Sequence, residues 1–536
     1  MDNLPGKLLA VYVLATLLAA GVGAGLVLRY RSALPALMRA PFAPSRPDGA
    51  ATTVGVARAT AALPSWLPHP LPTLADWRRA EWRLVAGLVG LSVLIALTHG
   101  AITHWATVDS GWSWPRMLLL SALLAWPALP AIALLRRWRQ RRLVAALVAW
   151  YAAAWVLAML RSNEAQSGAL VAQWLAFAMG PPVLALLLLT TRATRAAAPW
   201  LWLPLALLCF AAILGLDLLA WIVRDHLAAF APVLQWLSPT WAVLLFALAF
   251  VALAWWPVAR FARWLAHAYA KRWVSDAAVL FTAAWALNLG FDALATGPWA
   301  LVPLLWIPLA LGLARRWPRD RDGTRTPTLL VLRVFRHDAN INALFEEVVE
   351  RWRAVGQTVL IAGTDLVGQT TDAADLFDFL DGRLAKRFVH DAADVPARLA
   401  GFEWQPDAEG RWRVNECYCH DDAWQVALAA LVQRADLVLM DLRGFQAYNA
   451  GCRFELGVLA RAAHLARAVV IGDEGTDFAV ARADAADAPE GRFVWIDLGA
   501  PGEQRVARAR LSQRVRAALA GAGSPQPAAG TAALVS

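Results

Sequence analysis

Nine long apolar runs occupy the first 313 residues and limit what this chain can fold into. A helix needs about 20 apolar residues to cross a bilayer, and seven of the runs are close to that length. The last two are shorter. The runs are Leu8–Leu28, Leu84–Thr103, Met117–Leu135, Leu143–Leu160, Leu170–Thr190, Trp200–Val223, Trp241–Val258, Ala277–Asp292 and Trp299–Leu313. They predict a polytopic α-helical membrane domain over residues 1–314, with the lipid bilayer as its partner.

Basic residues alternate between the loops that join these runs. Five alternate loops hold 24 of the 28 Lys and Arg residues before position 326: Arg29–Arg83, Arg136–Arg142, Thr191–Ala198, Ala259–Trp273 and Arg315–Arg325. The remaining four are Lys7, Arg116, Arg161 and Arg224. Because basic loops stay on the cytoplasmic side, this asymmetry predicts an external N-terminus and a cytoplasmic C-terminal part. We expect the protein in the inner (plasma) membrane of a bacterium.

The net charge of +10 could suggest a nucleic-acid partner. Up to Arg325, however, the chain has 28 basic and 12 acidic residues, and after it 22 basic and 28 acidic residues. The excess of positive charge therefore belongs to the membrane part, where it reports orientation and attraction to anionic lipid. We expect no nucleic-acid partner. The four cysteines are too few for a disulfide scaffold and indicate a reducing compartment.

Residues 315–328 form a predicted linker, and the pattern then changes to short apolar runs that alternate with amphipathic segments. The predicted strands are 329–335, 358–362, 436–441, 468–471 and 493–496, and the predicted helices are 342–355, 375–384, 421–434, 452–465 and 504–519. This alternation is typical of an α/β domain with a parallel sheet, here over residues 329–520. The tail 521–536 is expected to be disordered.

Ligands of parallel α/β sheets bind beyond the carboxyl ends of the strands. His337 and Asp338 follow the first predicted strand, and Gly363, Thr364 and Asp365 follow the second. These residues are candidate ligand-binding residues, with backbone N–H groups available for phosphate or ribose. The structural alternative is a helix cap for His337 and Asp338 and a plain turn for Gly363, Thr364 and Asp365.

The densest cluster of polar residues begins at Asp441, the last residue of a predicted buried strand. Arg443 lies in the following loop, and Asn449 could cap the next helix; both, together with Gly451, are candidate ligand-binding residues. Glu455 falls about one turn into that helix, after Gly451, where partial burial can raise the pKa of its carboxyl group. Such a carboxylate could act as a nucleophile or stabilise an oxocarbenium-like centre, with Asp441 as a second carboxylate.

The stretch Asn449-Ala-Gly451-Cys452-Arg-Phe-Glu455 resembles the Ser-x-Trp-Cys-x-x-Glu motif of TIR (Toll/interleukin-1 receptor) domains. It is also similar to nucleoside deoxyribosyltransferases, which have Gly-x-x-x-Glu after an Asp-bearing loop. Both resemblances imply a flavodoxin-like sheet and a catalytic role for Glu455. In enzymatic TIR domains the equivalent Glu cleaves NAD at the nicotinamide–ribose bond. The resemblance thus implies NAD or another nucleotide as substrate or ligand, with no required cofactor.

The chain departs from the TIR motif at Asn449 and Gly451, and it inserts residues Arg387–Arg413 between the second and middle predicted strands. A non-enzymatic alternative is that Glu455 is a surface or salt-bridged residue of a domain that binds a nucleotide or a protein partner. A homo-oligomer is a further candidate assembly.

Two other groups of residues contain side chains with functional potential. Asp217, Asn288 and Asp292 lie within predicted spans, where they either end helices or form a transport site with a regulatory cytoplasmic domain. The segment Cys417-Tyr-Cys419-His420 contains metal-ligand residue types but lacks the second ligand pair of a structural zinc site. A strand leading into a helix is the simpler interpretation, and no metal is expected.

Overall fold

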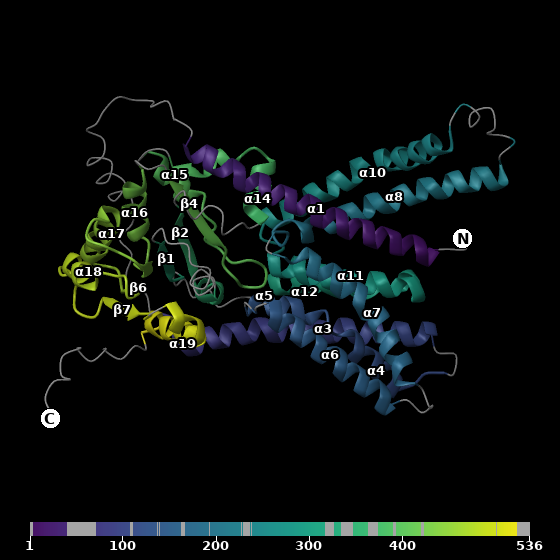
Figure 1. Ribbon diagram of the computed structural model, residues 1–536, viewed down its shortest axis with the longest axis horizontal. Helices are drawn as coiled ribbons and strands as arrows, with labels where there is room; N and C mark the ends of the chain where they lie inside the picture. The colour runs from purple at the N-terminus through teal and green to yellow at the C-terminus, as the bar shows by residue number, and fades with distance from the viewer. Residues whose placement is uncertain are drawn as a thin grey trace.

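The computed structural model consists of a helical bundle (residues 4–316) and a sheet domain (residues 326–521), which lie side by side along the long axis of the molecule (Figure 1). The described residues are 4–39, 71–107, 111–136, 138, 140–161, 167–191, 193–226, 228, 236, 238–316, 326–333, 347–362, 373–389, 393–419, 423–499 and 501–521. The predicted tail therefore lies almost wholly outside the described residues, as does most of the predicted linker.

The bundle is built from helices that match the apolar runs. They are α1 (Leu4–Arg39), α3 (Leu74–Thr107), α4 (Trp114–Leu124), α5 (Ala128–Leu135), α6 (Gln140–Arg161), α7 (Gly168–Leu189), α8 (Ala198–Asp225), α10 (Pro239–Ala270), α11 (Asp276–Thr296), the 3₁₀ helix η1 (Pro298–Leu305) and α12 (Trp306–Arg316). Six helices, α1, α3, α6, α7, α8 and α10, are long and apolar enough to cross a membrane. These six helices indicate a membrane protein, while the predicted count of nine spans is not confirmed.

The remaining three predicted spans differ from simple transmembrane helices. The run Met117–Leu135 is split by a turn at Ala125–Pro127 into the short helices α4 and α5, because a proline interrupts helical hydrogen bonding. The run Trp299–Leu313 is likewise divided between η1 and α12, with Pro303 inside η1. The third, α11, is packed inside the bundle, and Trp285, near its middle, is fully buried.

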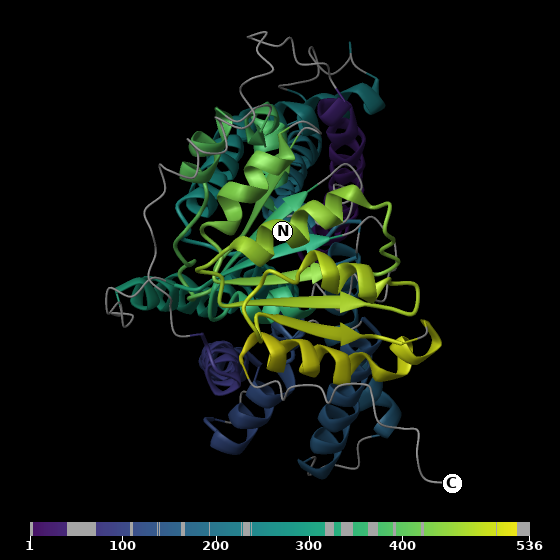
Figure 2. The same cartoon turned by 90° about the vertical axis from the view of Figure 1, so that its left-hand side faces the viewer.

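The sheet domain contains a seven-stranded, wholly parallel sheet, visible as arrows that point the same way in Figure 2. The strands are β1 (Thr328–Arg333), β2 (Gln357–Ala362), β3 (Phe388–Val389), β4 (Val414–Cys419), β5 (Leu437–Asp441), β6 (Arg467–Gly472) and β7 (Phe493–Asp497). Their order is β3-β4-β2-β1-β5-β6-β7. The parallel α/β prediction is confirmed. The edge strand β3 was not predicted, and β4 was anticipated only as a short strand leading into a helix.

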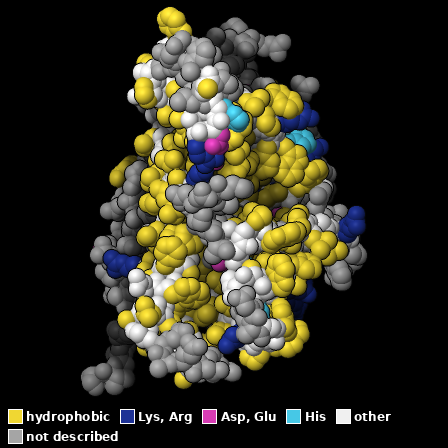
Figure 3. Space-filling view, turned by 90° about the vertical axis from the view of Figure 1, so that its right-hand side faces the viewer, with side chains coloured by type: hydrophobic (Ala, Val, Ile, Leu, Met, Phe, Trp, Pro, Cys, Tyr) yellow, Lys and Arg dark blue, Asp and Glu magenta, His cyan; other side chains and the backbone are white. Residues whose placement is uncertain are grey.

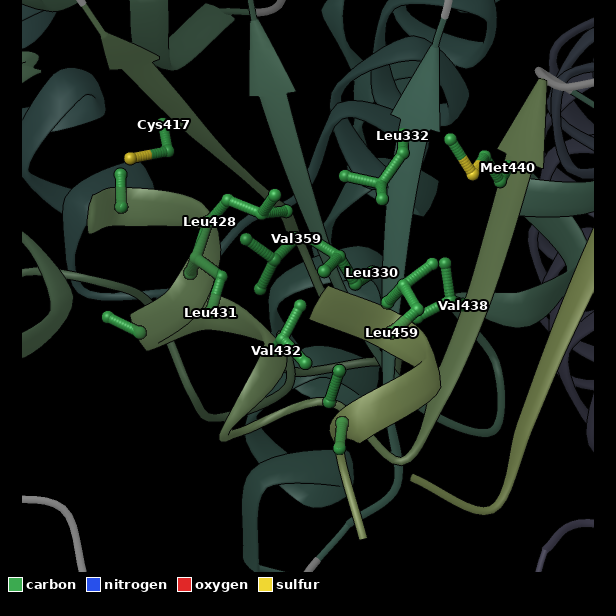
Figure 4. Packing of buried hydrophobic residues seen from close by; sticks show 14 of the residues in the cluster. Leu330, Leu332, Val359, Cys417, Leu428, Leu431, Val432, Val438, Met440 and Leu459 are labelled. Carbon is green, nitrogen blue, oxygen red and sulfur yellow. The ribbon is translucent and has the colours of Figure 1, made fainter. Parts of the chain in front are cut away.

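Helices cover both faces of the sheet because successive strand residues point to opposite sides. They are α14 (Ala373–Leu380), η2 (Leu384–Arg387), α15 (Asp394–Ala400), α16 (Trp424–Val432), α17 (Ala450–Arg461), α18 (Phe478–Asp484) and α19 (Pro501–Leu519). Leu330 and Val438 pack against Leu431 of α16 and Leu459 of α17 on one face (Figure 4). Residues of the other face pack against α19, the helical segment 347–352 and Trp77 of α3.

The segment inserted between β2 and β5 connects the sheet domain to the bundle. Residues 403–413, here called the docking segment, contain Arg413, whose guanidinium lies 3.8 Å from the ring centroid of Tyr269 at the end of α10. Its Nη2 donates to the Tyr269 carbonyl oxygen at 2.6 Å, and the backbone N–H of Ala408 donates to the Arg272 carbonyl oxygen at 3.1 Å. The docking segment is therefore one of the parts that anchor the sheet domain to the bundle.

Further contacts join the two parts away from the docking segment. The rings of Trp77 and Trp352 are 5.3 Å apart, and Arg351 donates to Glu81 of α3 at 2.8 Å. The hydroxyl oxygens of Tyr30 and Tyr418 are 3.3 Å apart. The bundle and the sheet domain therefore share apolar and polar contacts over several elements.

Candidate functional site

The predicted site lies at the carboxyl edge of the sheet, where β1 and β5 end side by side. Arg333, the last residue of β1, is in register with Asp441, the last residue of β5. The chain continues from β1 to β2 on one side of β1, whereas β5 pairs with its other side. Such a reversal of strand order leaves a crevice beyond the strand ends in parallel sheets. Of the candidates after β1 and β2, His337, Asp338, Gly363, Thr364 and Asp365 all lie outside the described residues and remain predictions.

Asp441 and Arg443 form a buried two-pronged ion pair. Arg443 donates from Nε to Oδ1 at 2.9 Å and from Nη2 to Oδ2 at 2.7 Å. The backbone N–H of Arg443 also donates to Oδ1, at 3.2 Å. Asp441 is only 2% exposed. Because both of its carboxylate oxygens are occupied, Asp441 acts in this arrangement to orient the guanidinium of Arg443.

The loop after β5 is held by the loop after β6. Asp473 accepts hydrogen bonds at Oδ1 from the backbone N–H of Gly444 at 2.9 Å and of Gly475 at 3.2 Å. Gln446 donates through Nε2 to the Gly475 carbonyl oxygen at 2.8 Å. The loop after β5, which contains Arg443, is therefore held in place by hydrogen-bond acceptors of the loop after β6.

Asn449 and Gly451 lie where α17 begins. Asn449 occupies the N-cap position, but its side chain makes no capping bond to the helix. Instead its Oδ1 accepts from the backbone N–H of Gln446 at 2.7 Å, which closes the loop before the helix. Gly451 is exposed, and a Cβ atom built on it would meet Trp424 at 3.8 Å. The space beside Gly451 is therefore bounded by an aromatic ring from α16.

Glu455 is half-buried on α17 and has no hydrogen-bond or ion-pair partner among the described residues. Loss of solvation on burial raises the pKa of its carboxyl group to about 7. Burial also raises the pKa of the Cys452 thiol to about 12, with smaller contributions from the charges of Glu455 and Asp441. Cys452 thus lies close enough to both carboxylates to be affected by their charges.

An unpaired carboxyl group with a pKa near 7 can exchange a proton at neutral pH. It is suited to act as a general acid or base, and its ionised form can act as a nucleophile. The structure places Asp441, Arg443, Asn449, Gly451 and Glu455 in one strand–loop–helix unit.

Two residues of this edge were not among the predicted site residues. Asp473 supports the loop, and the available signal was its position directly after the buried strand β6. Tyr448 is 81% exposed, an unusual exposure for an aromatic ring. No sequence signal distinguished Tyr448, because its exposure is a property of the folded chain.

No group of three or more His, Cys, Asp or Glu side chains arranged to hold a metal ion occurs in the part of the chain that the structure describes. Cys417 and Cys419 lie on β4 with their sulfur atoms 3.7 Å apart, and both are buried. His420 follows them but lies outside the described residues.

Comparison with known proteins gives no match: no family model, no curated protein and no solved structure matches the chain. The fold and the site define the class of protein, a helical membrane protein with a parallel α/β sheet domain. The resemblance to TIR domains and deoxyribosyltransferases therefore rests on the short motif 449–455 and its place in the sheet domain.

Proposed function

We propose that the sheet domain binds NAD or a related nucleotide and cleaves its N-glycosidic bond by means of Glu455. The observation that carries this proposal is the half-buried carboxyl group of Glu455, which has no partner among the described residues and whose pKa is raised to about 7 by loss of solvation. Perturbed ionisable groups without a structural partner are concentrated at functional sites. The resemblance of residues 449–455 to the TIR motif supplies the substrate class.

The strand order supports this proposal. When the inserted edge strands β3 and β4 are left out, the order is β2-β1-β5-β6-β7. Numbered along the chain, that is 2-1-3-4-5, the order of flavodoxin-like sheets. We infer a flavodoxin-like domain with an insertion, in which ligand would bind where β1 and β5 end.

In the proposed reaction, ionised Glu455 stabilises or attacks the ribose carbon as its bond to the nicotinamide nitrogen breaks. The pair of bond electrons leaves with nicotinamide, and water then supplies the hydroxyl group of the ADP-ribose product and releases a proton. The exposed ring of Tyr448 offers a surface on which a base can stack. Because the ionised form reacts, the rate is expected to rise with pH through about 7.

We further propose that the N-terminus lies outside a bacterial inner membrane and that the sheet domain lies in the cytoplasm, where NAD is available. The distribution of Lys and Arg between the loops supports this orientation. The bundle would then anchor the domain and report a signal to it through the docking segment.

The test uses the full chain in lipid nanodiscs, because the docking contacts tie the sheet domain to the bundle. The preparation is incubated with NAD, and nicotinamide release is followed by chromatography. We expect Glu455→Gln to reduce release by about 100-fold or more. The exposed Glu490→Gln is the matched control and should leave release unchanged. Absence of release from the wild-type chain, or its survival in Glu455→Gln, would overturn the proposed chemistry.

A second candidate is a sheet domain that binds a nucleotide without turning it over. The ion pair between Asp441 and Arg443 favours it, because Asp441 is then not free to assist catalysis. This candidate predicts saturable NAD binding to the nanodisc preparation by calorimetry, with equal affinity for the wild type and Glu455→Gln and with no nicotinamide released.

A further inference from the structure

A cluster of polar side chains lies inside the helical bundle, far from the candidate active site. Nε2 of His99 on α3 is 2.6 Å from Oδ2 of Asp292 on α11. Thr103, one turn beyond His99, donates to the same oxygen at 3.1 Å. One turn earlier on α11, Asn288 accepts a hydrogen bond at Oδ1 from Trp126 at 2.9 Å. These five residues are here called the intrabundle polar cluster.

The intrabundle polar cluster lies among apolar helices, where burying polar groups costs free energy. Ionisable side chains within membrane helices are expensive to place and commonly mark proton or ion pathways. His99 is completely buried, and it lies about eight residues, or about 12 Å, from the end of α3. Gly100 brings α4 against α3 here, since a Cβ atom on it would lie 2.1 Å from the Ser121 hydroxyl oxygen. An apolar residue would fill the position of His99 at lower cost.

The hydrogen bonds of the cluster leave one ring nitrogen of His99 unused. The short contact with Asp292 directs the Nε2 proton toward the carboxylate. Nδ1 is buried and has no hydrogen-bond partner in the described part of the chain. The Nδ2 group of Asn288 is likewise buried and unpartnered there. Nδ1 is thus the atom at which the His99–Asp292 pair can gain or lose a proton.

We propose that His99 and Asp292 form a proton-binding site inside the helical bundle, loaded from the end of the bundle remote from the sheet domain. The side chain of Asp292 is 23% exposed, whereas that of His99 is not exposed at all. Asp292 also lies four residues before the end of α11 at Thr296. Hydrophobic side chains dominate that end of the molecule, with few acidic groups among them (Figure 3). Asp292 is therefore the member of the pair that lies nearer to solvent, at the end of the bundle remote from the sheet domain.

Other charged and titratable groups on the packed elements have different positions or partners. His104 of α3 accepts a hydrogen bond from the backbone N–H of Ser113 through Nε2 at 3.1 Å. Lys7 of α1 pairs with Asp217 of α8 at 2.5 Å. Tyr12 lies beside Phe291, Arg116 near the start of α4, Asp276 at the start of α11, and Arg315 and Arg316 at the end of α12. The first three turns of α3 carry Asp76, Arg78, Arg79, Glu81 and Arg83, and the end of α8 carries Arg224 and Asp225. The sequences of α5, α7 and η1 contain no charged residue.

The helix that carries Asp292 also contacts the sheet domain. Ser275 caps the start of α11 by accepting from the backbone N–H of Ala278, and its hydroxyl donates to Glu409 of the docking segment. Asp276 and Asp292 are separated by about 24 Å along the helix at 1.5 Å per residue. A single rigid element therefore joins the proton-binding site to the docking segment.

The test is a titration of the full chain in lipid nanodiscs with isotope-labelled histidine rings. Infrared or solid-state NMR spectra distinguish neutral from protonated imidazole, and they are recorded from about pH 4 to about pH 9. We expect the wild type minus His99→Gln difference to contain a protonated-ring signal that appears with falling pH. The buried His104→Gln is the matched control and should retain that signal. A pH-independent difference, or loss of the same signal in His104→Gln, would overturn the proposal.

A second variant guards against misfolding of His99→Gln. Asp292→Asn keeps the size of the side chain and can still accept a hydrogen bond, but it removes the counter-charge. We expect the protonated-ring signal to be lost in this variant while the His99 ring itself is present. An unchanged titration in Asp292→Asn would show that the carboxylate takes no part and would contradict the site as proposed.

Discussion

The docking segment and the carboxyl edge of the sheet both contain carboxyl groups that are withdrawn from solvent. The two regions differ in whether each of these groups has an arginine partner. In the docking segment Asp407 is 2.8 Å from Arg413, and Glu350 pairs with Arg411. At the carboxyl edge Asp441 is likewise paired, with Arg443, whereas Glu455 has no partner in the described part of the chain. A buried charge with an arginine partner serves the structure, because its removal leaves the other charge alone. A buried carboxyl group without one is available for chemistry.

The pKa of a carboxyl group does not by itself separate the two regions. Burial raises the pKa of Glu409 in the docking segment to about 7, as it does for Glu455. The contacts separate them. Glu409 accepts a hydrogen bond from the hydroxyl group of Ser275 at the start of α11 and faces the bundle, whereas Glu455 lies on the helix that follows β5. Equal pKa values therefore accompany a docking role in one place and a proposed catalytic role in the other.

The largest expected effect comes from breaking the docking segment. Arg413→Ala removes the partner of Asp407 and the contact with Tyr269, and we expect it to destabilise the full chain by about 3–5 kcal/mol. The exposed ion pair of Arg453 with Asp484, at 2.8 Å, is the matched control. Arg453→Ala should cost less than about 1 kcal/mol. Thermal unfolding in detergent measures both, and equal losses would show that the docking pair is no stronger than a surface pair.

Much of the fold could be predicted because local sequence patterns determine its helices and central strands. The central strands β1, β5 and β6 are continuous apolar runs, as strands buried on both faces must be. β4 was harder to predict because its sequence, VNECYC, is not apolar throughout, and β3 has only two residues. The run Met117–Leu135 is apolar almost throughout, so its split into α4 and α5 depends on a local feature, the turn that contains Pro127.

Glu455 offers the second-largest effect, through the pH dependence of stability. Its pKa in the folded chain is raised from 4.5 to about 7, so the folded state binds a proton more readily than the unfolded state. The stability from this group is present below about pH 4.5 and is lost as the pH rises to about 7. Glu455→Gln removes this dependence, and we expect it to stabilise the chain at about pH 8 by about 1–2 kcal/mol. Parallel profiles for wild type and variant would show that Glu455 is solvated.

Glu409→Gln sharpens the comparison because it changes the other carboxyl group of similar pKa. Gln can still accept the hydrogen bond from Ser275, so we expect a change in stability on the order of 1 kcal/mol above about pH 7. Nicotinamide release should stay at the wild-type level. The same chromatographic assay checks this outcome, and a loss of release comparable to that of Glu455→Gln would show that the two regions are not functionally distinct.

The contacts that separate the two regions could not be predicted from the sequence, because they join distant residues. Arg413 bonds to Tyr269, 144 positions away, and His99 meets Asp292, 193 positions away. The position of Glu455 near the carboxyl edge followed from counting turns of its helix. That no described residue pairs with it depends on where the arginines of the fold are placed, which no local sequence pattern predicts.

The smallest expected effect is at Gly451, where the TIR motif has Trp. A Cβ atom there meets only the Trp424 ring, at 3.8 Å, which is an ordinary contact. Because Gly451 lies in the first turn of α17, Gly451→Ala should stabilise the chain by about 0.5–1 kcal/mol by reducing the freedom of the unfolded chain. Thermal unfolding measures this gain. If nicotinamide release falls in the stabilised variant, the space beside Gly451 is occupied by substrate. If release is unchanged, the departure from the TIR motif at this position has no part in the reaction.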